Sequence, residues 1–229
     1  MADVPVVAVR GEAVLEVPPE IARFTVTVAA RDSDRPTALS RLTRRVDAVR
    51  EVLDEYAEAI ERRETGQIQV RPELKRTGER VSAYSANLTT TVTVTDFATL
   101  GELMLRLADE EQSSVYGPSW ALRPDSPVHR RARHAAVDDA LVRAREYAEA
   151  VGARLDRLLL LSDSGMSSSA PPVPMAYGVA TFRAADATPQ LDLEPQAQTV
   201  HASIEMRFAV TEPTELAHRD ARPGGPEGA

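Results

Sequence analysis

Four histidines are the first residues to consider as metal ligands or as general acids and bases: His129, His134, His201 and His218. His129 and His134 share a predicted helix but are five residues apart, whereas two ligands on one helical face stand three or four residues apart. His201 belongs to the polar face of a predicted strand. We therefore expect solvated histidines and predict no metal site.

Adjacent carboxylates occur at Asp138-Asp139 and at Asp109-Glu110-Glu111. Such groups could act as general acid and base or bind a cation. Neighbouring helix residues point about 100° apart, and both groups lie on predicted wet faces near helix ends, so we expect solvated charge. The serine-rich run 162–169 lacks the Gly-x-Ser-x-Gly pattern of a serine nucleophile. The sequence thus predicts no catalytic residue.

Gly11 and two aromatic residues complete the candidates. Gly11 precedes Glu12 and does not begin the Gly-x-Gly-x-x-Gly pattern of dinucleotide sites, so we predict no cofactor and expect Gly11 to form a bulge or kink in a strand. Tyr116 and Trp120 share one extended run. We expect both to pack in the core or against another subunit, and not to form a ligand platform.

Composition removes several classes of function. The chain has no cysteine, which excludes disulfides, thiolate nucleophiles and Cys-ligated zinc. Its formal net charge of -8, with no basic stripe, argues against nucleic acid as a partner. The chain begins without a basic region and a long apolar stretch, and it holds no run of roughly 20 apolar residues. We therefore expect a cytoplasmic protein with no membrane span.

The elements that must position these residues start with Val9–Arg31, two extended runs joined by Pro18-Pro19. We expect these runs to form a strand pair in a sheet used for assembly. A helix is predicted from Pro36 to about Arg62. Its apolar residues have heptad spacing, which fits a helix lying on its own sheet, the interpretation we favour, or an intermolecular helix pair. They are Leu39, Leu42, Val46, Val49, Leu53, Tyr56 and Ile60.

The next part of the chain returns to strands. Two strands are predicted between Thr65 and Thr95. We expect Asp96 to cap a short helix, and Gly117-Pro118 predicts a bulge or an edge position in the extended run that follows. The inward face of the short helix is expected to contain Leu100, Leu103, Met104 and Leu107.

The third predicted helix has clear end signals. Pro127 follows a cap at Asp125 or Ser126, and Gly152 closes the helix. The apolar run Leu155–Ser162 then predicts a short strand buried on both faces. The inner face of the helix is mostly alanine and consists of Val128, Ala132, Ala136, Ala140, Ala144 and Val151.

The segment 164–196 is rich in Ser, Ala and Pro and has no period, which favours disorder, although long loops can also be functional. A last strand follows, and we expect no structure after Thr211. Together the elements predict an α+β fold with a largely antiparallel sheet, or sheets, covered on one face by three helices. Two intertwined α/β plaits are the alternative. The inner face of the last strand is expected to contain Val200, Ala202, Ile204, Met206, Phe208 and Val210.

Several segments, in their order and spacing, resemble the SIMPL-domain family, formerly a domain of unknown function, over about Val6 to Val210. The chain departs from the family pattern at Ala13, Glu20 and Gln196. We expect a SIMPL-like domain over residues 1–211, in one piece or as two interleaved subdomains, and a disordered tail over 212–229. The segments that carry the resemblance are Val9-Arg10-Gly11, Pro19-Glu20, Gln67 to Pro72, Tyr84 to Val92, Ala132-Arg133 with Ala136, Gly152, and Val200 to Phe208.

The resemblance implies neither an established reaction nor agreed catalytic residues. It implies an association of bacterial members with oxidative-stress defence and with ring-like or channel-like homo-oligomers, and of the animal namesake with a signalling kinase. We therefore expect a non-enzymatic homo-oligomeric scaffold or binding module linked to stress defence. The alternatives are an enzyme or small-ligand binder whose lid is the 164–196 loop, and an adaptor for a signalling protein.

Overall fold

The computed structural model describes residues 4–75, 78, 80–163, 191 and 193–215. The expectations for most of the 164–196 loop and for the end of the tail lie outside the described residues. The chain folds into two compact units, one built on a four-stranded sheet and one on a three-stranded sheet. In the sequence, the four-stranded unit is inserted between the first strand of the three-stranded unit and that unit's one described helix.

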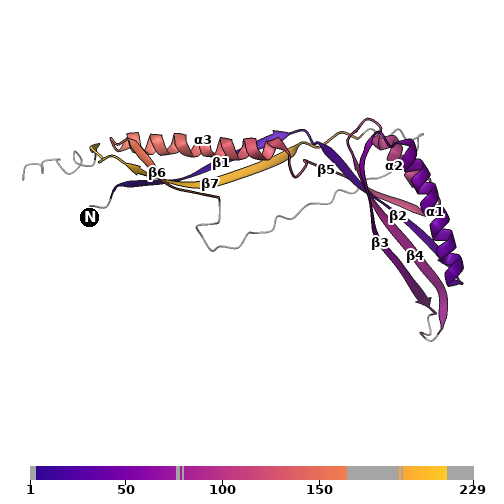
Figure 1. The fold of residues 1–229 in the computed structure, drawn as a ribbon. Helices are drawn as coiled ribbons and strands as arrows, with labels where there is room; N and C mark the ends of the chain where they lie inside the picture. The colour runs from indigo at the N-terminus through magenta and orange to yellow at the C-terminus, as the bar shows by residue number, and fades with distance from the viewer. Residues whose placement is uncertain (1–3, 76–77, 79, 164–190, 192, 216–229) are drawn as a thin grey trace, which may run out of the picture. The chain divides into compact units, whose positions relative to one another are not determined.

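The four-stranded unit has the βαββαβ order of an α/β plait. Its strands pair antiparallel in the order β3-β4-β2-β5. The two helices cover one face of this sheet, and their apolar side chains meet those of β2 and β4 in one core (Figure 1). The elements are β2 (Ile21–Asp32), α1 (Arg35–Glu55), β3 (Ile60–Leu74), β4 (Val81–Val94), α2 (Leu100–Ala108) and β5 (Ser113–Ala121).

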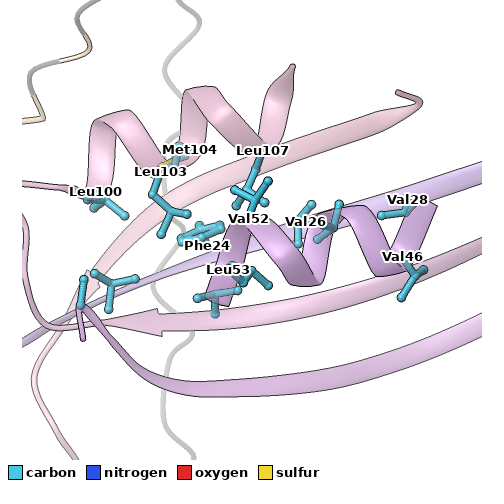
Figure 2. Packing of buried hydrophobic residues seen from close by; sticks show 14 of the residues in the cluster. Phe24, Val26, Val28, Val46, Val52, Leu53, Leu100, Leu103, Met104 and Leu107 are labelled. Atoms are coloured by element: carbon cyan, nitrogen blue, oxygen red, sulfur yellow. The ribbon is translucent and has the colours of Figure 1, made fainter. Parts of the chain in front are cut away.

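The core of this unit follows from two periodicities. Alternate residues of β2 face the helices, because successive strand side chains point to opposite faces. Figure 2 shows Phe24, Val26 and Val28 of β2 among buried residues of both helices. All four predicted inward residues of α2 are buried as expected. Together these side chains form the larger of the described apolar cores.

Helix α1 lies on its own sheet, which confirms the favoured interpretation. Four residues of the heptad pattern, Leu42, Val46, Val49 and Leu53, are buried there. The predicted end near Arg62 is wrong, because α1 ends at Glu55 and β3 begins at Ile60. An apolar residue that opens a strand also faces the core, so the heptad spacing alone could not locate the end of the helix.

The predicted capping residues were right for α3 and wrong for α2. The N-cap of α2 is Thr99 and makes no side-chain cap hydrogen bond. Asp96 instead lies in the preceding turn, where its Oδ1 accepts a hydrogen bond from Ala98 N at 3.0 Å. In α3 the Ser126 hydroxyl accepts from Val128 N at 3.3 Å, as one of the two predicted caps.

Strand β5 is an edge strand, as the Gly117-Pro118 pair predicts. That peptide bond is cis, and the pairing with β2 is irregular between Arg23 and Thr25. Trp120 packs edge-on against Phe97, with ring centroids 4.9 Å apart, which confirms its packing role. Tyr116 does not pack in the core, since 79% of it is exposed.

The three-stranded unit has strand order β1-β7-β6, with α3 lying along β1 and β7 (Figure 1). The runs on either side of Pro18-Pro19 therefore belong to different sheets, and the predicted strand pair is wrong. The α+β fold class is confirmed, in its two-sheet form. The elements are β1 (Val6–Val17), α3 (Pro127–Ala150), β6 (Leu155–Asp163) and β7 (Gln198–Val210).

Small residues let α3 approach the sheet closely. The predicted alanines Ala132, Ala136, Ala140 and Ala144 are fully buried. A Cβ added at Gly11 would clash with the Ala136 carbonyl and would lie 2.7 Å from Ala140 Cβ. Gly11 therefore makes room for the helix on this strand, while the bulge or kink predicted there stays a prediction.

The end of α3 holds the first residues of the tail. Gly152 has a φ of 69°, which suits glycine and confirms the predicted helix exit. Thr214 Oγ1 donates to the Gly152 carbonyl at 3.1 Å, and Glu215 N donates to the Val151 carbonyl at 3.2 Å. The expectation of no structure after Thr211 is thus wrong for these residues.

Candidate interface at strand β6

Strand β6 differs most from its prediction. Its four consecutive leucines were expected to be buried on both faces, and each is exposed by between 38% and 50%. These leucines are exposed because β6 forms an edge of the three-stranded sheet. We call Leu158, Leu159, Leu160 and Leu161 the leucine strip.

The register shows why the helix leaves these residues uncovered. Leu158 lies opposite Phe208, and Leu161 lies opposite Met206. Phe208 and Met206 are buried in the core formed with α3, so both leucines lie on the helix side of the sheet. Helix α3 packs extensively on β1 and only slightly on β6. The helix layer therefore stops before the edge, and the leucines there meet solvent.

The other three edge strands carry features that discourage pairing with another chain. Strand β1 places Arg10, Glu12 and Glu16 among its exposed residues. Strand β3 begins with the charged run Glu61–Glu64, and β5 contains a proline. In β6 the charged residues Asp156, Arg157 and Asp163 lie toward the ends, and the centre consists of four consecutive leucines.

The spacing of residues in the sequence did not predict that two histidines line the same hollow. His129 of α3 and His201 of β7 line a hollow of about 240 Å³ with Arg133, Asp163 and Ser203. Nothing in the sequence relates these positions, because only the packing of α3 on the sheet brings them together. His134 does not line this hollow, and His218 lies outside the described residues. The described residues contain no group of three or more His, Asp or Glu able to hold a metal.

The acidic pairs have defined partners. Asp139 Oδ2 accepts a hydrogen bond from Glu12 N at 2.9 Å and faces Arg143 Nε at 3.0 Å. The hydrogen bond from Glu12, aided by Arg143, holds the pKa of Asp139 below its ordinary value against the opposing effect of burial. In the second cluster, Glu111 forms an ion pair with Arg45. In each cluster, one carboxylate thus has a protein partner in addition to solvent.

These features define an antiparallel α+β protein with an uncovered apolar strand edge. The family described as "Protein of unknown function (DUF541)", SIMPL, matches residues 7–208, and the chain belongs to this family. It is 28% identical over 193 residues to the 26 kDa periplasmic immunogenic protein of Brucella melitensis biotype 1, across 77% of this chain and 72% of the relative. The protein of the same name from Brucella abortus (strain S19) matches equally.

The chain is similar to solved structures over part of its length. The uncharacterized protein TM1266 from Thermotoga maritima is 19% identical, with a TM-score of 0.23, over 43% of this chain and 95% of that protein. Within the described part of the chain, no helix has the length and apolar character needed to cross a membrane.

Proposed function

We propose that this SIMPL protein acts as a homo-oligomeric scaffold that assembles through strand β6. The observation that carries the proposal is the exposed leucine strip on an edge strand without charge or proline at its centre. An edge strand presents N–H and C=O groups that another strand can pair with. Asp156, Arg157 and Asp163 flank the strip, so the surface has an apolar centre and a polar rim, as protein interfaces do.

A two-fold contact is the simplest assembly, because it uses the same surface on both copies. Antiparallel pairing of two β6 strands would extend each three-stranded sheet into one of six strands. Covering a half-exposed leucine completely contributes about 1 kcal/mol, so about 8 kcal/mol is the upper limit for eight leucines. The cost of association is about 4–15 kcal/mol. The apolar contribution alone is therefore marginal, and backbone pairing between the strands must contribute as well.

The test is the native mass of a charged variant. We expect the Leu158→Glu/Leu161→Glu double variant to have the monomer mass of 24.9 kDa by light scattering after size exclusion, because four carboxylates would then meet across the two-fold contact. A matched control, Val142→Glu/Tyr147→Glu, changes two exposed residues of α3 and should keep the native mass. Circular dichroism establishes that both variants fold. A folded β6 variant with the wild-type mass would rule out this interface.

Stress defence, a further protein partner and a cytoplasmic location stay predictions. The family resemblance supports the first, and the name of the Brucella relatives places those proteins in the periplasm. Fractionation of the native host, followed by detection of the chain in each fraction, tests the location. Survival of a deletion strain under peroxide, with and without a wild-type copy, tests the role in stress.

A further inference from the structure

Helix α1 of the four-stranded unit carries three arginines on one face. Arg41, Arg44 and Arg45 are spaced three and four residues apart, so their side chains are neighbours on the helix surface. They line a hollow of about 370 Å³ together with Ala48 of α1 and with Glu110 and Glu111, which follow α2. The lining has three positive and two negative side chains, and the Asp32 carboxylate pairs with Arg41 beside it.

Two of the arginines are fixed by the fold. The Arg45 side chain is only 16% exposed and pairs with Glu111, while its Nη1 donates to the Ala29 carbonyl at 2.8 Å. Arg41 Nη2 lies 3.1 Å from Asp32 Oδ2. A backbone hydrogen bond from Asp34, aided by this positive charge, holds the pKa of Asp32 below its ordinary value. Both guanidinium groups are therefore ordered before any ligand arrives, which lowers the entropic cost of binding.

The third arginine is the available group. Arg44 is exposed and makes no hydrogen bond or ion pair with any residue that the structure describes. Asp32 pairs with Arg41 and Glu111 pairs with Arg45, so the charge of Arg44 is the one in this arginine group that no described carboxylate pairs with. An anion bound by Arg44 would neutralise this remaining positive charge.

We infer that this hollow binds a small multivalent anion through a phosphate group. Guanidinium groups form paired, charge-assisted hydrogen bonds with phosphate oxygens, and the volume lies within the usual range of small-molecule sites. Glu110 also lines the hollow and opposes an anion, so the affinity should be modest. Free phosphate and the phosphate group of a larger metabolite share this chemistry. The inference is independent of assembly through β6.

The experiment is isothermal titration calorimetry on the full chain with three probes: inorganic phosphate, pyrophosphate and AMP. We expect pyrophosphate to bind once per chain with a Kd below about 1 mM. Tighter binding of AMP than of phosphate would indicate a metabolite, and the reverse would indicate the free anion. Raising the salt concentration should weaken binding, because the charges are near the surface.

Three variants make the test specific. Arg44→Gln should weaken pyrophosphate binding by ~10-fold or more, whereas Glu110→Gln should strengthen it by removing a like charge. Arg50→Gln, on the same helix but outside the hollow, should leave the affinity unchanged. The inference is overturned if pyrophosphate does not saturate the wild-type chain, if Arg44→Gln binds as the wild type does, or if Arg50→Gln loses as much affinity as Arg44→Gln.

Discussion

Asp139 joins helix α3 to strand β1 through one carboxylate. Its Oδ2 accepts from Glu12 N, and Arg143, one turn further along α3, neutralises its charge at 3.0 Å. Because the hydrogen bond favours the ionised form, the pKa of Asp139 is lower in the folded chain than in the unfolded chain. The carboxylate therefore stabilises the fold above the unfolded pKa, near pH 4, and this contribution is lost as the pH falls through the lowered folded value.

We predict that Asp139→Asn lowers the free energy of unfolding by about 1 kcal/mol at pH 7, and that the difference from the wild type shrinks below about pH 4. Urea denaturation at several pH values measures it. Asp138→Asn, the exposed neighbour on the same helix, serves as the control and should change stability little. A difference that stays constant with pH would show that the ionised carboxylate does not matter.

Gly11 of β1 leaves the space that α3 needs to pack on the strand. Gly11→Ala should destabilise the chain by about 1–3 kcal/mol or more, because the new methyl group meets the Ala136 carbonyl on a rigid helix. Gly66→Ala is the control, since its nearest contact would be Thr89 O at 3.3 Å. Denaturation of both variants measures the effect. Equal stabilities would mean that α3 moves away from β1 at no cost.

The stability of each core depends on the helix face that is buried against the sheet. We predict that Leu103→Ala, on the buried face of α2, lowers the free energy of unfolding by about 2–5 kcal/mol. Leu105→Ala removes the same atoms from a half-exposed position of the same helix and should cost much less. Urea denaturation compares the two. A similar loss in both variants would contradict the assignment of the buried face.

Helix faces and strand alternation could be predicted because they are local patterns. The alanine face of α3, its Ser126 cap and its Gly152 exit all depend on residues close in sequence, as does the alternation of Ile204, Met206 and Phe208 in β7. Tertiary position could not be predicted in this way. Four leucines in a row fit a central strand and an edge strand equally well, so the exposure of β6 emerged only from the sheet order.

The candidate sites were hidden for the same reason. His129 and His201 are 72 positions apart, and the arginines of α1 face the acidic residues after α2 only because both helices pack on one sheet. Arg41, Arg44 and Arg45 do have a helical spacing that could have drawn attention to them. Their acidic neighbours, however, carry no signal that would connect them to α1.

At the scale of the whole molecule, the proposed assembly joins copies of the chain through an apolar strand edge. The net charge of -8 opposes association of copies, since like-charged molecules repel. Salt screens that repulsion and leaves the apolar contact in place. Assembly through the leucine strip should therefore persist, or strengthen, as the ionic strength rises.

The most direct measurement is the native mass of the wild-type protein by light scattering after size exclusion, at two protein concentrations and two salt concentrations. The account predicts a defined multiple of 24.9 kDa that survives the higher salt. A mass of 24.9 kDa under all four conditions would contradict it, because the leucine strip would then be exposed without a second copy to cover it.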